Sequence, residues 1–135
     1  NLKIEEIAKI VNAIKDLENE IMSEHMVKGG IDADRKKYEV FIHERDYQWI
    51  IKSDCGIFEI SNPSLGVGAE IADMVHLKKP VLCLYKSGFK DRVSAYILGK
   101  DGSRFVKTPF ECYEYDTLGD AKYAVKKFLG ENFKS

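Results

Sequence analysis

Apolar residues recur along the chain with two different spacings. Residues 1–17 and 37–52 carry them at the three- and four-residue intervals of an amphipathic helix. Elsewhere they gather in short runs that are compact or alternate with polar residues, as in β-strands. The runs typical of strands are EIMSEHM (20–26), CGIFEI (55–60), VLCLY (81–85) and FECYEY (110–115).

The predicted helices alternate with these strands. One helix opens the chain, and a further helix follows each strand: the five are predicted over 1–17, 37–52, 70–78, 92–99 and 117–133. Such alternation is typical of an α/β fold with a doubly wound parallel sheet and helices on both faces, of the flavodoxin or Rossmann type. The sequence therefore predicts a single α/β domain over residues 1–135.

The first predicted element is unusual for this class. Doubly wound sheets normally open with a strand, which is central in the 2-1-3-4-5 strand order. A sheet without its central strand would leave two inner edges unpaired, which is unfavourable. We therefore expect that residues preceding Asn1 in the natural protein supply a first strand that this sequence lacks.

Composition narrows the classes of partner. The hydrophobic share of 44% and the charged share of 32% are those of a soluble globular domain. The net charge of −1 gives no basic field for nucleic acid, and no apolar run approaches the ~20 residues of a membrane span. Three cysteines beside strand-like runs indicate reduced thiols, and hence a reducing compartment, the cytoplasm or the nucleus.

The segment SNPSLGVGAE (61–70) carries the candidate chemistry. It follows the carboxyl end of a predicted strand, where open α/β sheets bind ligands. Gly66 and Gly68 allow close backbone approach and unusual dihedral angles, and Ser64 adds a hydroxyl near the helix cap. The N–H groups of the following helix would receive an anion, above all a phosphate. The alternative is a plain strand-to-helix turn in which the glycines only pack.

Two carboxylates accompany this loop. Glu70 stands where the helix is predicted to begin, either as a partner of the helix dipole or as a reactive group beside the anion site. Asp46 lies on the preceding helix, and paired carboxylates suit glycosidic chemistry. Its alternative is a solvated helix face shared with Glu44 and Arg45. HERD lacks the spacing of a zinc motif, so neither a metal nor a cofactor is expected.

The histidines and the tryptophan are less informative. His25 ends the second predicted element near the ligand edge, where it either contacts a ligand or is an ordinary surface histidine. His43 and His76 are predicted on helix surfaces, and Trp49 is predicted in the core.

Several segments together resemble a known family. DCGIFEISNPSLGVGAE, PVLCLY, RVSAYI and DGSRF are similar to the 2′-deoxynucleoside 5′-phosphate N-hydrolases of the Rcl type, in the nucleoside 2-deoxyribosyltransferase superfamily. The resemblance runs from about His25 to the last helix, and PSLGVGxE is its most specific part. It implies cleavage of a 2′-deoxynucleoside 5′-monophosphate to the free base and 2-deoxyribose 5-phosphate.

The resemblance also implies residue roles. Glu70 matches the nucleophile, which forms a covalent deoxyribosyl ester that water then opens. Asp46 matches a carboxylate that acts as acid/base or binds the sugar, and Ser64 and Gly66 match phosphate-loop positions. Ser94 matches a serine that reaches the phosphate bound to a neighbouring subunit, which implies a homodimer.

The sequence departs from the family at three places. The family's N-terminal strand, with its glycine-rich loop, arginine and tyrosine, has no match here. Ala69 stands where relatives often have tyrosine, and Ala72 where they often have glycine, so the base preference is not carried over.

Two other functions compete with hydrolysis. A deoxyribosyltransferase would use the same carboxylate on unphosphorylated nucleosides, and the serines at 64 and 94 argue against it. A nucleotide-binding module would bind the ligand without turnover.

Overall fold

The structure of the protein is a computed structural model that describes residues 32–133. The predicted helix 1–17, the predicted strand 20–26 and His25 lie outside these residues. The described elements are α3 (Asp32–Lys52), β1 (Gly56–Glu59), α4 (Leu65–His76), β2 (Val81–Lys86), the 3₁₀ helix η1 (Lys90–Arg92), α5 (Ala95–Leu98), β3 (Phe110–Tyr115) and α6 (Leu118–Asn132).

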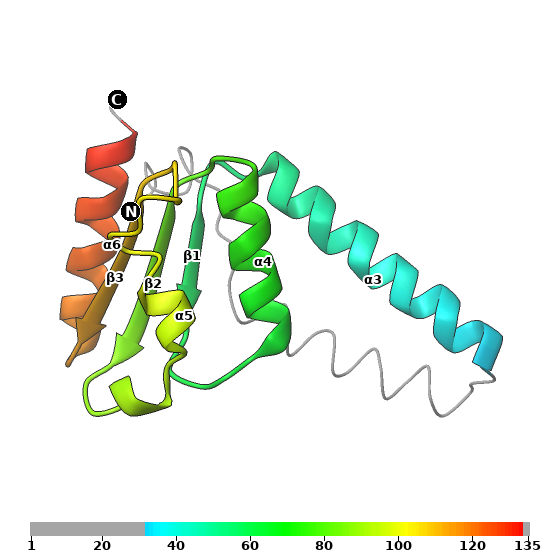
Figure 1. The fold of residues 1–135 in the computed structure, drawn as a ribbon, viewed down its shortest axis with the longest axis horizontal. Coiled ribbons are helices and arrows are strands. Elements are labelled where there is room, and N and C mark those ends of the chain that lie inside the picture. The colour runs from blue at the N-terminus through cyan, green and yellow to red at the C-terminus, as the bar shows by residue number, and fades with distance from the viewer. Residues whose placement is uncertain (1–31, 134–135) are drawn as a thin grey trace.

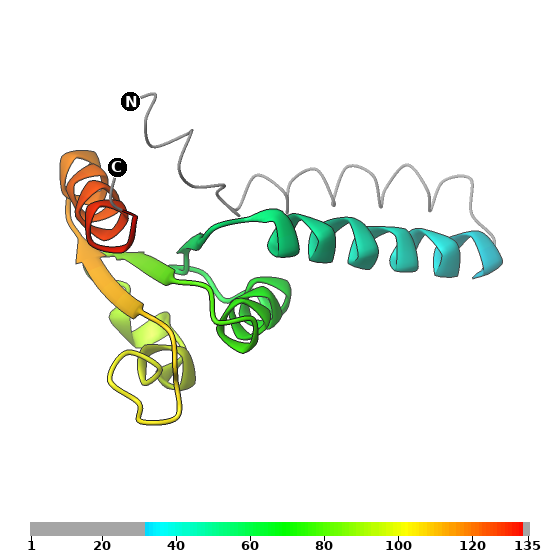
Figure 2. The ribbon, with the colours of Figure 1, turned by 90° about the horizontal axis from the view of Figure 1, so that it is seen from above.

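The strands form an open parallel sheet in the order β1-β2-β3 (Figure 1). The helices α4 and α5 lie on one face of this sheet and α6 lies on the other (Figure 2). The predicted α/β class with a parallel sheet and helices on both faces is thus confirmed. Within residues 32–133, β1 pairs with β2 alone, and the expected first strand stays a prediction.

The core has two layers, one on each face of the sheet. Phe58 packs with Ile50, Ile71 and Met74 on the side of α3 and α4. The second core layer lies on the opposite face of the sheet, against α6. Its buried members are Cys55, Ile57, Leu82, Leu84, Ala124, Phe128 and Leu129. Alternate residues of each strand enter opposite layers, which explains why the run VLCLY is almost wholly apolar.

Helix α4 begins earlier than the sequence predicted. Its first residue is Leu65, so Glu70 lies in the second turn rather than at the helix start. Gly66 and Gly68 are therefore helical and neither has a positive φ angle, so neither uses the unusual dihedral angles that glycine allows. The cause is Ser64, whose hydroxyl accepts a backbone N–H of the first turn and caps the helix.

Helix α3 also differs in its bounds and its buried face. It begins at Asp32, five residues before the predicted start at residue 37. Tyr38 and Ile50 are buried, but Trp49 is 37% exposed, so its predicted core position is wrong. The helical period places Trp49 at the edge of the buried stripe, where the Arg45 guanidinium lies 4.6 Å from its ring centroid.

Close packing at the start of β1 requires a glycine. A Cβ atom on Gly56 would lie 2.5 Å from the ring of Phe58 and 3.2 Å from Cγ of Met74. Because both side chains are fully buried, Gly56→Ala is expected to lower the free energy of unfolding by about 1–3 kcal/mol. Urea denaturation measures this change. The control is Gly130→Ala on α6, where a Cβ meets nothing within 4 Å, and equal stability of both variants would contradict the prediction.

Candidate functional site

The turn after β1 leads directly into the amino end of α4, at the carboxyl edge of the sheet. Ser64 has extended backbone angles, and its Oγ accepts the N–H of Val67 at 3.2 Å. This bond uses one of the free N–H groups of the first turn and leaves others for a ligand. The arrangement is a helix N-terminus in the position where α/β proteins bind anions.

The first two turns of α4 present two different surfaces. Gly66 and Glu70 are four residues apart and share one surface, while Gly68 and Ala72 share another, about 200° further around the helix. Helical side chains lean toward the amino end, so the Glu70 side chain leans over Gly66. Among residues 32–133, the atom nearest to a Cβ placed on Gly66 would be the Ser64 Oγ, at 4.0 Å. Glu70 therefore lies one turn beyond the capped amino end of α4, on the surface that Gly66 begins.

Asp46 lies on the buried face of α3. It continues a stripe of residues spaced by four, in which Tyr38 and Ile50 are buried and Ile42 is half-buried. Its side chain is only 13% exposed, and the Arg45 guanidinium lies 3.2 Å from Oδ1. The alternative of a solvated helix face is therefore wrong for Asp46. The spacing from Ile42 and Ile50 is the signal that could have predicted this from the sequence.

Asp46 and Glu70 lie on neighbouring helices, α3 and α4. Figure 1 shows α4 running from the carboxyl edge of the sheet toward its amino edge, whereas α3 starts well to the side of the sheet and slants toward the same amino edge. The two helices meet in the core layer that contains Ile50 of α3 and Met74 of α4. Asp46 precedes Ile50 by four residues and Glu70 precedes Met74 by four, so each carboxylate lies one helical turn before the residue that its helix contributes to this core layer.

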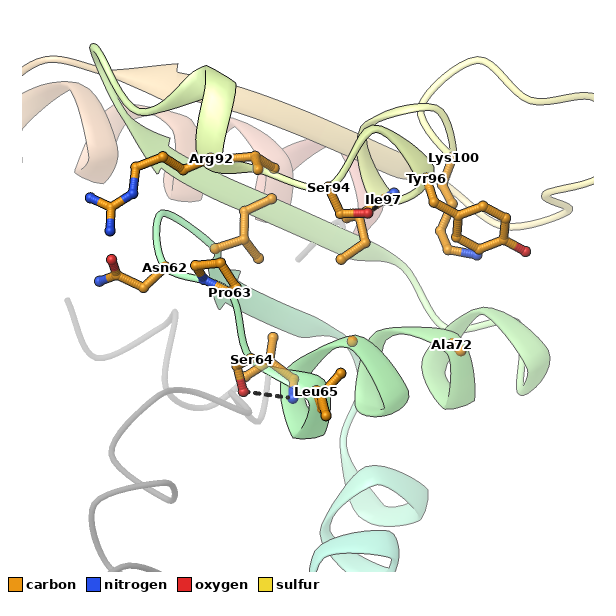
Figure 3. Close-up of a pocket in the computed structure, with 14 residues that line it drawn as sticks. Asn62, Pro63, Ser64, Leu65, Ala72, Arg92, Ser94, Tyr96, Ile97 and Lys100 are labelled. Atoms are coloured by element: carbon orange, nitrogen blue, oxygen red, sulfur yellow. Dashed lines mark hydrogen bonds between the residues drawn. The ribbon is translucent and has the colours of Figure 1, made fainter.

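A cavity of about 680 Å³ lies on the other surface of α4. It separates the start of α4 from η1 and α5 (Figure 3). The cavity brings together three of the predicted residues, Ser64, Gly68 and Ser94, and its walls include neither Glu70 nor Asp46. The remaining lining residues are Ile60, Asn62, Pro63, Leu65, Val67, Ala72, Arg92, Val93, Tyr96, Ile97 and Lys100.

Two cations mark the ends of this cavity. Arg92 and Asn62 point toward one another at one end, and Tyr96 and Lys100 lie at the other (Figure 3). The Lys100 ammonium is 4.8 Å from the centroid of the Tyr96 ring. Ser94 lies between them and caps α5 by accepting the N–H of Ile97 at 3.4 Å. The sequence interpretation overlooked both cations, although Arg92 is the first residue of the RVSAYI motif and Lys100 follows the motif by three residues.

Other chemistries find little support in residues 32–133. No group of three or more His, Cys, Asp or Glu side chains gathers there as a metal site would require. All three thiols are free, as predicted, and burial raises the pKa of Cys55 to about 12. His43 and His76 are exposed, as predicted. No helix in this part of the chain has the length and apolarity of a membrane span.

The chain is similar to several curated proteins. It is 33% identical over 117 residues to the 5-hydroxymethyl-dUMP N-hydrolase of Rattus norvegicus, covering 84% of this chain and 71% of that protein. It is 48% identical over 67 residues to the protein of the same name from Tetraodon nigroviridis, covering 49% of this chain and 47% of the relative. It is 38% identical over 95 residues to a Nematostella vectensis relative named for 2′-deoxynucleoside 5′-phosphate N-hydrolase activity, covering 65% of this chain and 63% of that protein. No family model matches the chain.

The open parallel sheet and the capped helix after β1 define a Rossmann-like α/β domain with a helix N-terminus at the carboxyl edge of its sheet. Together with these similarities, they show that the chain belongs to the family of 2′-deoxynucleoside 5′-phosphate N-hydrolases. The chain spans 63% of the length of the Nematostella protein and 47% of the length of the Tetraodon protein, that is, between about half and two thirds of these two relatives.

Proposed function

We propose that the protein hydrolyses the N-glycosidic bond of 2′-deoxynucleoside 5′-monophosphates, releasing the free base and 2-deoxyribose 5-phosphate. The observation that carries this proposal is the position of Glu70, one turn beyond the capped amino end of α4. The N-hydrolase names of the relatives support the same reaction.

The helix N-terminus and Ser64 would hold the 5′-phosphate, because a dianion is favoured beside free N–H groups and the positive end of a helix. A phosphate bound there would place the sugar along the surface of Gly66 and Glu70. This anchoring would convert binding energy at the phosphate into orientation of the reacting carbon.

Glu70 would act as the nucleophile on C1′ of the sugar. A 2-deoxy sugar lacks the electron-withdrawing hydroxyl beside C1′, so its oxocarbenium-like transition state is easier to reach and a carboxylate stabilises it. The base would leave with the electron pair of the N-glycosidic bond and take up a proton. Water would then open the glutamyl ester, adding hydroxyl to C1′ and releasing a proton, with Asp46 assisting as acid/base or holding the sugar.

We also propose that the protein is a homodimer in which Ser94 contacts the phosphate bound to the neighbouring subunit. Ser94 lies across the cavity on the Gly68 surface of α4, away from Glu70 of its own chain. The rim of this cavity carries exposed apolar side chains, with Leu65 96% and Tyr96 81% exposed. Exposed apolar groups gathered in this way mark protein interfaces.

Ser94→Ala is expected to raise KM for the monophosphate by about tenfold, the effect of one hydrogen bond to a charged group. KM for the matching nucleoside, which has no phosphate, should change less than twofold, roughly within the scatter of neutral substitutions. Steady-state kinetics on both substrates measure the difference. Ser87→Ala, at an exposed serine of the same connection, is the control. Equal effects on the two substrates would contradict a phosphate role for Ser94.

The proposed reaction is tested with the full-length protein. A panel of deoxynucleoside 5′-monophosphates and matching nucleosides is incubated with and without a second free base, and the products are separated by chromatography. Free base together with deoxyribose 5-phosphate, released much faster from monophosphates than base is released from the matching nucleosides, would support the hydrolase. A new nucleoside formed only with added base would indicate a transferase, and nucleotide binding without product would indicate a binding module.

A further inference from the structure

The last residues of the three strands converge on one side chain. Ser61 follows β1, is 5% exposed and lies beside Glu59, Lys86 and Tyr115, the final residues of β1, β2 and β3. Glu59 Oε1 accepts the N–H of Ser61 at 2.7 Å, and Glu59 Oε2 accepts the Ser61 hydroxyl at 2.7 Å. The Ser61 Oγ in turn accepts the N–H of Lys86 at 2.8 Å.

Tyr115 completes the network from the far strand. Its hydroxyl donates a hydrogen bond to Glu59 Oε2, and this bond raises the pKa of Tyr115, so the phenol stays protonated as the donor. Lys86 supports the same edge, because its Nζ donates to the carbonyl of Asp116 at 2.7 Å and lies 5.8 Å from the ring centroid of Tyr115. One carboxylate therefore accepts three hydrogen bonds and connects residues that are far apart in the sequence.

The network holds the turn that enters α4. Ser61 is the first residue of the turn that ends at Ser64, the cap of the helix N-terminus. These residues lie on the α6 side of the sheet, since Tyr115 packs against the layer of Ile57 and Phe128. The network thus lies behind the proposed phosphate site and would act on it only through the backbone of this turn.

We infer that Glu59 and Tyr115 are positioning residues that fix the turn 61–64, and with it the helix N-terminus that would bind the 5′-phosphate. This inference rests on the proposed function. A charge-assisted hydrogen bond that joins the end of β1 to the end of β3 can hold this backbone more firmly than the two-residue contact between Glu59 and Ser61 alone. Substrates with a phosphate would then depend on Tyr115, whereas substrates without one would not.

The test compares Tyr115→Phe with Tyr113→Phe, two residues earlier on the same face of β3, in the full-length protein. Tyr115→Phe is expected to raise KM for a deoxynucleoside 5′-monophosphate about fivefold to tenfold, while turnover of the matching nucleoside changes less than about twofold. Ser61→Ala should give the same KM change, and the double variant should add little, because both substitutions break one network. Tyr113→Phe should leave both substrates unaffected.

A second measurement does not depend on activity. Amide hydrogen exchange of residues 62–67 should be faster in Tyr115→Phe than in Tyr113→Phe, because the turn opens more easily. Unchanged exchange there, or equal losses with both substrates, would overturn the inference. If the wild-type protein releases no base from any substrate, the proposed function fails, and the exchange experiment still decides whether Glu59 and Tyr115 fix the turn.

Discussion

Glu70→Gln is expected to lower kcat for base release from a deoxynucleoside 5′-monophosphate by about 10³-fold or more, because the covalent step loses its nucleophile. The glutamine has nearly the same shape and keeps an acceptor oxygen, so substrate binding should change little. The half-buried position of Glu70 on the surface of α4 lets the variant fold. Chromatographic rates at saturating substrate measure the loss, and the melting temperature reports on the fold.

Two further variants separate nucleophilic attack from a general electrostatic effect. Glu70→Asp keeps the charge but shortens the side chain by one methylene, so it should remain strongly impaired, because attack on C1′ depends on reach. Asp73→Asn removes a carboxylate from the next turn of the same helix and should retain normal turnover. Mass spectrometry of quenched wild-type enzyme should detect a deoxyribosyl phosphate adduct that Glu70→Gln lacks. Near-normal activity of Glu70→Gln would remove Glu70 as the nucleophile.

The strands were predictable because burial on both faces leaves a strong local pattern. CGIFEI, VLCLY and FECYEY all became strands, with bounds close to those expected. Each run places alternate residues in the two core layers, so tertiary packing and local pattern agree. The last helix was equally clear, since Thr117 and Asp120 form a capping box at its start.

The start of α4 was not predictable by the same reasoning. Glycine disfavours helix interiors, so two glycines in LGVG suggested a loop that ends near Glu70. In the structure the burial of Val67 and Ile71 and the Ser64 cap outweigh that preference. The consequence is functional, because the helical period assigns Gly66 and Gly68 to different surfaces, one with Glu70 and one facing Ser94.

The network around Ser61 could not be found in the sequence at all. Its bonds join Glu59 to Tyr115 and Ser61 to Lys86, which are pairs from different strands. Only the parallel register of the sheet brings these strand ends together. Sequence patterns report local periodicity, and contacts of this kind depend on which strands become neighbours.

Asp46→Asn is expected to lower kcat by about 10²–10⁴-fold, the usual range for loss of a general acid or base. The side chain is 13% exposed and pairs with Arg45, so a purely structural role must be separated from a chemical one. Arg45→Gln is the matched control, because it breaks the same ion pair and leaves the Asp46 carboxylate in place. If Asp46 only stabilises the helix through Arg45, both variants should lose stability alike and keep their turnover per folded molecule.

The leaving group distinguishes the two chemical roles that remain for Asp46. A 7-methylpurine deoxynucleotide carries a positively charged base that departs without protonation. If Asp46 protonates the base, the defect of Asp46→Asn should shrink to less than about tenfold on this substrate, because the step it assists is no longer needed. If Asp46 instead binds the sugar, the defect should persist on the activated substrate and disappear with a sugar that lacks the 3′-hydroxyl. If Asp46→Asn keeps full activity on both substrates, the Asp46 carboxylate has no part in the reaction.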